Sequence, residues 1–358
     1  MDGRFYFIIH LRGGIIMATL KDVAALAGVS AATVSLYLNG KAAGRVSAQK
    51  QKEIEDAIRQ LSYEPNAASR QLRGLGQKKP FYTIAVYWAS DTRSALLGKV
   101  LSGIQESILE KGSLNIHVVF CPFVPNELFK EKGLIEPNLF NYDAAIIANT
   151  TLMDMQYLNS ITPAIPIVLL NRYLQQYNSV TVDNKKMGAD LADLVADHGH
   201  TSVAVFRTQT PYLAMDDRVS GFIDRCRERG IKMPNHALFY TDGTIEGGMQ
   251  TASDFLKLSE YPDVVFCEMD SIALGVLYQF HKSSIRIPED ISVISVGLNH
   301  SSVTKCCIPP LTVSEVPLTQ IAKVCMDVAT EKLTSDDISN EPAHIQLSTR
   351  IILRESLK

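Results

Sequence analysis

The chain has 358 residues, of which 46% are hydrophobic and 20% are charged, and its formal net charge is −3. That length and composition exclude a largely disordered chain and predict a globular protein of two or three domains. The charge is unevenly divided, because residues 1–80 carry 12 Lys and Arg against 6 Asp and Glu, whereas residues 81–358 have a balance of −9. A basic N-terminal part on an acidic remainder predicts a polyanion-binding module joined to domains that do not bind polyanions.

The first sixteen residues contain a short apolar run at positions 5–9. This run is too short to span a membrane, and no A-x-A-like cleavage site follows it. Met17 stands directly before a well-patterned helix. We therefore expect residues 1–16 to be a dispensable extension, non-native or disordered, with Met17 as the natural start. The alternative is a genuine short tail.

Residues 17–64 show the pattern of short helices. Apolar residues at positions 20, 23, 24 and 27 have helical spacing, and Gly28 ends that helix. Ser30 can cap a second helix at residues 31–38, which ends at Asn39 and Gly40. Ser47 can cap a third helix with a buried side at positions 54, 57, 58 and 61. Two short helices joined by a tight glycine-containing turn predict a helix-turn-helix.

Several segments carry a resemblance to a known family: residues 19–24 (TLKDVA), 27–35 (AGVSAATVS), 38–40 (LNG) and 63–72 (YEPNAASRQL). The first three resemble the DNA-binding head of the lactose/galactose repressor (LacI/GalR) family of bacterial transcription regulators, and the last resembles the hinge of that family. The resemblance implies a sequence-specific DNA-binding regulator, most simply a repressor.

The resemblance also implies DNA contacts position by position. Residues 31, 32 and 36 would face base edges in the major groove, other positions would touch phosphates, and residues 66–72 would form a hinge helix in the minor groove. Reading a near-palindromic operator on double-stranded DNA needs two heads, which implies a homodimer. The implied DNA-binding residues are Leu20, Ala31, Ala32, Thr33, Ser35, Leu36, Asn39, Asn66, Ser69, Arg70 and Leu72.

Two positions depart from the family pattern. The family often has Arg or His at position 36, and Leu36 cannot make the bidentate contact to guanine that Arg makes. Because Ala31 and Ala32 offer no side-chain hydrogen bonds either, readout in the major groove is predicted to be apolar. The alternative is that Leu36 belongs to the helix core. Ser69 stands where the family usually has Ala, which should weaken the hinge helix.

From residue 81 onward, short apolar runs alternate with amphipathic segments. This alternation predicts an α/β fold with parallel sheets, and about ten strands would overfill one sheet, so we expect two subdomains with the ligand in the cleft between them. The expected strands cover residues 82–88, 116–121, 144–148, 167–170, 202–206, 264–267, 291–296 and 345–353, and the expected helices include residues 97–109, 186–197 and 218–229.

The body carries the same resemblance less tightly, at residues 171–172, 182–184, 218–222, 270–275 and 309–312. The family's body has a periplasmic-binding-protein-like fold in two subdomains and senses a small-molecule effector, so the resemblance implies sugar binding. The expected organisation is residues 17–64 as the DNA-binding domain, 65–80 as hinge and linker, and 81–358 as the effector-binding and dimerisation domain. Its two subdomains are expected to comprise residues 81–183 with 315–335, and 184–314 with 336–358.

A sugar pocket needs carboxylates, amides and arginines for hydroxyl groups and an aromatic face for the ring. Arg218 leads the candidates, the alternative being a solvated helix charge; Asp270 could instead cap the following helix, and Trp88 could pack rather than stack. Apolar residues 96 and 97 at the expected lip would suit a glycoside or another partly apolar effector. The candidate effector-binding residues are Trp88, Asn171, Arg172, Asp183, Arg218, Asp270 and Asn299, the last standing near where the family usually has Asp.

Other classes of protein find little support in the sequence. The six cysteines form no C-x-x-C pair and no histidine lies at metal-ligand spacing, so we expect reduced thiols, no metal and no cofactor. Neither a dinucleotide-binding glycine motif after residue 88 nor a G-x-S-x-G elbow is present, which argues against an α/β enzyme. An extracytoplasmic sugar-binding module without a DNA role is the other alternative. We expect a cytoplasmic regulator that does not associate with membranes.

Overall fold

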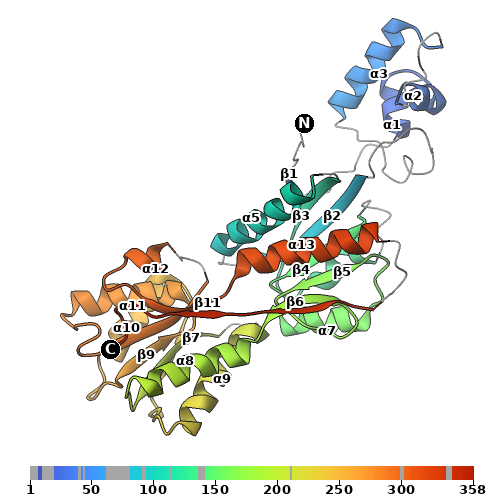
Figure 1. The fold of residues 1–358 in the computed structure, drawn as a ribbon. Coiled ribbons are helices and arrows are strands. Elements are labelled where there is room, and N and C mark those ends of the chain that lie inside the picture. The colour runs from blue at the N-terminus through green and yellow to red at the C-terminus, as the bar shows by residue number, and fades with distance from the viewer. Residues whose placement is uncertain are drawn as a thin grey trace.

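The computed structural model describes residues 7–9, 20–38, 42, 45–61, 81–90, 94–112, 114–135, 142–209, 212–298, 302–335 and 341–358. Figure 1 shows a small helical head drawn apart from two α/β subdomains that lie end to end. The C-terminus lies in the second subdomain, at the far end from the head.

The head consists of α1 (Leu20–Leu26), α2 (Ala31–Leu38) and α3 (Ala48–Gln60). Gly28 takes a φ of +60° in the turn between α1 and α2, and these helices meet at 105°. The Ser30 hydroxyl accepts the backbone N–H of Thr33 at 3.1 Å, as an N-cap does. The head core consists of Val23, Ala24, Ala27, Val34, Ile54 and Ala57. The predicted helix-turn-helix is therefore confirmed.

No single helix in the described part of the chain is long and apolar enough to cross a membrane. The bent pair α1 and α2 passes such a test by length and composition alone, and its apolar residues Val23, Ala24 and Val34 are buried in the head core.

The first subdomain is built on a seven-stranded sheet in the order β1-β3-β2-β4-β5-β6-β12, in which every neighbouring pair is parallel. The strands are β1 (Phe7–Ile9), β2 (Phe81–Ala89), β3 (Asn115–Phe123), β4 (Ala144–Ala148), β5 (Ile167–Leu170), β6 (Asn178–Val182) and β12 (His344–Leu347). Helices α5 (Ser94–Lys111) and α13 (Leu318–Thr334) pack on one face. The other face is covered by α7 (Leu152–Ser160) and the short helices η1 (Leu128–Lys130) and η2 (Lys132–Leu134).

Strand β2 shows why both faces of this sheet are buried. Ile84, Val86 and Trp88 belong to the core on the α5 and α13 side, whereas Ala85 and Tyr87 belong to the core under α7. Successive side chains of a strand point to opposite faces, so a continuous apolar run fills two cores.

The second subdomain is built on a six-stranded sheet in the order β13-β11-β10-β9-β7-β8. Its strands are β7 (Val203–Thr208), β8 (Leu238–Thr241), β9 (Val264–Cys267), β10 (Ser292–Gly297), β11 (Thr312–Glu315) and β13 (Arg350–Ile352). Its helices are α8 (Asn184–Asp197), α9 (Leu213–Glu228), α10 (Ile245–Phe255), α11 (Asp270–Lys282) and α12 (Val303–Cys306). All strand pairs are parallel except β11 with β13. The predicted α/β class with two mostly parallel sheets is confirmed.

The chain passes between the subdomains between β6 and α8, between β11 and α13, and between β12 and β13. The third passage corrects the expected division, which gave all of residues 336–358 to the second subdomain. β12 instead pairs with β6 in the first sheet, where Asn178 Oδ1 accepts the Ala343 N–H at 3.0 Å. The expected single strand at residues 345–353 is thus two short strands, because its first half extends one sheet and its second half the other.

The N-terminal extension also differs from expectation. Residues 7–9 form β1, which pairs in parallel with residues 118–120 of β3. A strand there covers backbone groups along the edge of β3 that would otherwise have no strand partner. Three residues of the extension therefore belong to the first sheet, which the expectation of a disordered extension did not include.

Candidate DNA-binding head and effector pocket

Helix α2 presents its side chains in the way that a recognition helix requires. Val34 is fully buried in the head core, whereas Ala32 is exposed and Thr33, Ser35 and Leu36 are half-buried. The side of the helix that carries Val34 thus faces the core, and the rest of its surface remains partly open to a partner.

The head structure distinguishes between the candidate DNA-binding residues. Leu20 and Ala31 pack against the head core. Leu36 is not among the described side chains that pack there, unlike its neighbours Tyr37 and Leu38. This arrangement favours an outward role for Leu36 over the alternative of a core residue. Asn39, Asn66, Ser69, Arg70 and Leu72 lie outside the described residues.

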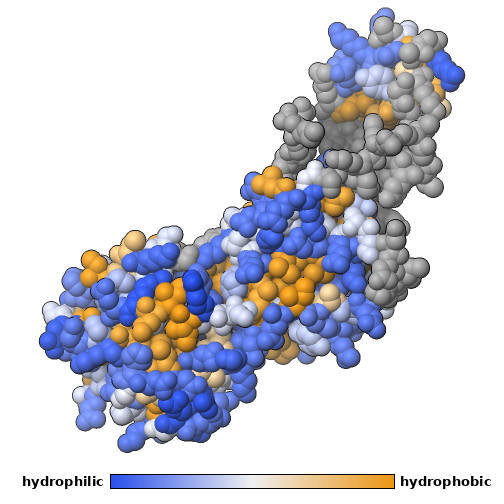
Figure 2. All heavy atoms as spheres, in the orientation of Figure 1, coloured by the Kyte–Doolittle hydropathy of each residue, from blue (hydrophilic) through white to orange (hydrophobic). Residues whose placement is uncertain are grey.

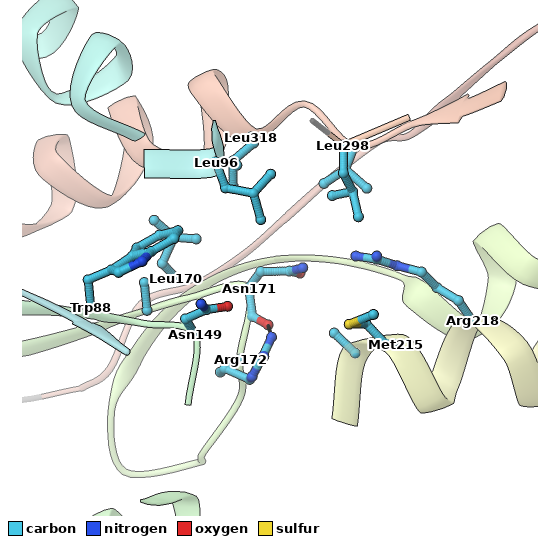
Figure 3. A pocket seen from close by; sticks show the side chains of 13 residues that line it. Trp88, Leu96, Asn149, Leu170, Asn171, Arg172, Met215, Arg218, Leu298 and Leu318 are labelled. Atoms are coloured by element: carbon cyan, nitrogen blue, oxygen red, sulfur yellow. Dashed lines mark hydrogen bonds between the residues drawn. The ribbon is translucent and has the colours of Figure 1, made fainter. Parts of the chain in front are cut away.

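A pocket lies where the two subdomains meet, at the carboxyl ends of β2, β4 and β5 (Figure 3). The second subdomain contributes to it from α9 and from the end of β10, and the passage from β11 to α13 closes it. Ligands of parallel α/β folds bind at this edge of a sheet. The described lining residues are Trp88, Leu96, Ala148, Asn149, Leu170, Asn171, Arg172, Ala214, Met215, Arg218, Leu298, Val316 and Leu318.

Arg218 reaches into the pocket from α9, on the side opposite Trp88 (Figure 3). It is only 2% exposed, so it is not a solvated helix charge. Arg225, Arg227 and Arg229 of the same segment, in contrast, form ion pairs near the surface. α9 lies close to α8 because Gly188 has no side chain: a Cβ there would lie 1.9 Å from the Arg218 carbonyl oxygen.

A chain of hydrogen bonds joins Arg218 to the first subdomain. Its Nε donates to Asn184 Oδ1 at 2.9 Å, and Asn184 Nδ2 donates to Asn171 Oδ1 at 3.4 Å. The Arg172 guanidinium then donates to the carbonyl of Asn171 at 2.7 Å and to that of Thr150 at 3.1 Å. Asn171 has a φ of +51° at the end of β5, a conformation that Asn adopts more readily than most residues. These contacts tie both walls of the pocket together.

Four of the predicted effector-binding residues line the pocket: Trp88, Asn171, Arg172 and Arg218. Trp88 is 5% exposed and belongs to the core as well, so it both packs and borders the pocket. Of the two apolar residues expected at the lip, Leu96 lines the pocket and Leu97 does not. Asn299 lies outside the described residues.

Two predicted carboxylates do not line the pocket and bind backbone instead. Asp183 caps α8 by accepting the Lys186 N–H at 2.8 Å. Asp270 is fully buried and accepts the Leu298 N–H at 3.0 Å, which fixes the turn after β10. Asp270 therefore holds a wall of the pocket in place without bordering it.

Sequence reasoning missed most of the apolar lining and one amide. Asn149 follows β4 with a φ of +63° and donates to the Ala89 carbonyl at 3.5 Å, so it stands at the strand end as Asn171 does. Its position after a buried apolar strand was a signal that could have found it. Met215, Leu298 and Leu318 carry no such signal, because their residue types are those of any core.

Comparison with known proteins agrees with both parts of the chain. Residues 19–66 match the model of bacterial regulatory proteins of the lacI family, and residues 192–357 match a periplasmic binding protein-like domain. The chain is 36% identical to a LacI family transcription regulator of Clostridium acetobutylicum of known structure, with a TM-score of 0.72 over 76% of this chain and 99% of that one.

Two further relatives cover nearly the whole chain. The ribose operon repressor of Escherichia coli K12 is 26% identical over 95% of this chain and 100% of its own length. The structure of the lac repressor dimer bound to operator and an anti-inducer is 22% identical, with a TM-score of 0.66 over 95% of this chain and 99% of that one.

A helix-turn-helix head joined to a two-subdomain body with a pocket between the subdomains defines an effector-controlled, DNA-binding transcription regulator. The chain belongs to the LacI family of bacterial regulatory proteins.

Proposed function

We propose that this chain is a homodimeric repressor that binds a near-palindromic operator. Its affinity for DNA changes when a small molecule binds between the subdomains. The observation that carries the proposal is the pocket itself, whose lining comes from both subdomains and the passage between β11 and α13. A ligand that contacts both walls stabilises one relative position of the subdomains, and only such a differential interaction can shift a two-state equilibrium.

The head is proposed to bind DNA through α2, with Ala32 and Leu36 facing base edges and Thr33 and Ser35 near phosphates. Their exposure and the absence of Leu36 from the described head core support this orientation. An apolar contact from Leu36 would favour the methyl group of thymine. The hinge residues proposed from the resemblance, 66–72, lie outside the described part of the structure.

Dimerisation is proposed to use the side of the second subdomain formed by β8, α10 and α11. Tyr240, Ile245 and Tyr278 are 52%, 37% and 55% exposed there. Figure 2 shows a hydrophobic patch on the visible face of each subdomain, without assigning these residues to it. Exposed hydrophobic patches mark interaction surfaces. Two copies are what a near-palindromic site requires.

The chain is proposed to act on DNA in the cytoplasm and to have no catalytic role. The relatives compared are transcription regulators by name.

The proposed function is tested by selecting operators from random-sequence DNA with the full-length protein. We expect dimers to select a near-palindromic consensus. Their affinity for this consensus should fall at high salt, because phosphate contacts release counterions. Addition of compounds that quench Trp88, the only tryptophan of the chain, should change the affinity for that consensus. A protein that selects no consensus would contradict the proposal.

A further inference from the structure

The walls of the pocket are mostly apolar. Trp88, Leu96 and Leu318 border it from the first subdomain, and Met215 and Leu298 border it from the second. Such walls favour a ligand with a largely apolar body, since each apolar contact removes hydrocarbon surface from water.

The polar groups of the pocket are amides and guanidinium groups. Both charged residues among the described lining are arginines, Arg172 and Arg218, and the uncharged polar ones are Asn149 and Asn171. No carboxylate lines the pocket in the described residues. A neutral sugar offers many hydroxyl hydrogens, for which carboxylates are the strongest acceptors, whereas a guanidinium fork matches a carboxylate or phosphate.

Three carboxylates near the pocket are engaged elsewhere, and a fourth, Asp217, interacts electrostatically with Arg172 and Arg218 without lining the pocket. Asp183 and Asp270 each accept a backbone N–H. Glu268 is fully buried, accepts the N–H and the hydroxyl of Thr208 at 3.0 Å each, and lies 3.8 Å from Arg207 Nε. If Asp183, Asp270 or Glu268 turned toward a ligand, it would lose a contact that holds the backbone in place.

The apolar residues and the arginine lie at different sides of the pocket (Figure 3). Trp88 lies at one side of the pocket near Leu96 and Leu170, and Arg218 enters from the opposite side with its guanidinium pointing inward near Leu298. The arrangement suits a molecule with an apolar or ring-shaped part at one end and a charged group at the other.

We propose that the effector is a small organic acid, whose carboxylate or phosphate binds Arg218 while its apolar or ring-shaped part packs against Trp88 and Leu96, rather than a neutral sugar. This inference rests on the proposed function, because it takes this pocket to be the effector site.

The test compares matched pairs of compounds on the full-length wild-type protein, with Trp88 fluorescence and isothermal titration calorimetry as readouts. Phenylacetate is paired with phenylacetamide, and ribose 5-phosphate with ribose. The first pair tests a carboxylate on an apolar body, and the second tests a phosphate on a sugar. In at least one pair we expect the anion to bind about 10-fold or more tightly than its neutral partner, as one charge-assisted interaction allows.

Variants of Arg218 assign the selectivity to that side chain. R218Q should abolish the preference for the anion, and R218K should retain part of it, since Lys keeps the charge and loses the fork. R225Q is the matched control, because Arg225 lies on the same helix and pairs with Asp193 and Glu228 instead of lining the pocket. R225Q should retain the wild-type preference.

Failure of this inference is distinguishable from failure of the proposed function. Tighter binding of a neutral sugar than of any anion, or the lack of anion selectivity in every pair, overturns the inference. If that neutral sugar also changes operator affinity, the proposed function stands. Anion selectivity that survives R218Q in a folded protein also overturns the inference.

Discussion

The head and the body place their polar side chains in opposite environments, at a surface in the head and in a buried pocket in the body. In the head, the polar side chains of α2 are half-buried at a surface, and residues 1–80 carry a net charge of +6. In the body, one arginine that is 2% exposed is held by Asn184 against a mostly apolar pocket. A long polyanion is bound by many screened, exposed charges, whereas a small ligand is selected by a few preorganised donors in a dry site. The difference predicts that the two sites can be impaired separately.

Removal of residues 1–79 should have the largest effect. Specific operator binding should disappear, a loss of at least about 100-fold, because specific sites are typically bound 10³–10⁷-fold more tightly than random DNA. The body should remain folded and should still respond to ligand through Trp88. Gel-shift and fluorescence titrations on the same preparation measure both properties. Operator binding by the truncated protein would show that the head is not the DNA-binding part.

Gly188→Ala should damage the body without touching the head. The new Cβ would lie 1.9 Å from the Arg218 carbonyl oxygen, so α8 and α9 must move apart. Overpacking of this kind costs about 1–3 kcal/mol, and it should also displace Arg218 and weaken ligand binding. Calorimetric melting measures the loss of stability.

Gly98→Ala is the matched control for that substitution. Gly98 lies within α5, and a Cβ there meets nothing within 4 Å, so the better helix propensity of Ala should leave the melting temperature unchanged or higher. Equal melting temperatures of the Gly188→Ala and wild-type proteins would show that the helix contact is not tight.

Leu36→Arg should alter base preference and leave the body unaffected. Arg can bridge O6 and N7 of guanine, so the selected operator should gain a guanine in each half-site, worth about 1–3 kcal/mol. Leu38→Met is a suitable control, because Leu38 packs against the head core and should change stability rather than preference. An unchanged consensus for Leu36→Arg would indicate that Leu36 belongs to the helix core and does not face the bases.

Asn184→Ala should weaken the communication between the sites more than either site alone. It removes the acceptor of Arg218 Nε and the donor to Asn171, contacts worth about 1 kcal/mol in typical cases. The factor by which ligand changes operator affinity should therefore fall. Lys186→Ala on the same helix breaks only an exposed ion pair with Asp190 and should leave that factor intact. Equal factors in both variants would exclude the hydrogen-bond chain as the coupling element.

Deletion of residues 1–16 should have the smallest effect. Loss of β1 exposes the edge of β3, so we expect a slightly lower melting temperature and more aggregation, with operator affinity nearly unchanged. Light scattering and thermal melts of the two forms measure these properties. Identical behaviour of both forms would support the initial expectation that the extension is dispensable.

Local patterns explain why the head was predictable. Its helices follow from apolar spacing, Gly28 and the Ser30 cap, all of which act within a few residues. The strand pairings of β1 and β12 were not predictable, because their partners β3 and β6 lie more than 100 residues away in the chain. Short strands at sheet edges have little sequence signal of their own.

Pocket residues were predictable where a polar side chain stands at a chain position that faces the cleft. Arg218 and Asn171 stand at helix and strand positions that face the cleft, and both line it. Asp183 and Asp270 have equally suitable side chains, but a carboxylate that caps a helix or holds a turn cannot be distinguished from a ligand-binding one without coordinates. Of the apolar lining, only Trp88 and Leu96 were predicted.

The most direct test of the central claim is a reciprocal binding measurement. The dissociation constant of the tightest-binding compound of the matched pairs is measured by Trp88 fluorescence, with and without a saturating amount of the selected operator. If pocket and head are coupled, operator must change that constant by the same factor by which the compound changes operator affinity. The account predicts equal factors different from one. An identical dissociation constant with and without operator, for a compound whose binding requires Arg218, would contradict it.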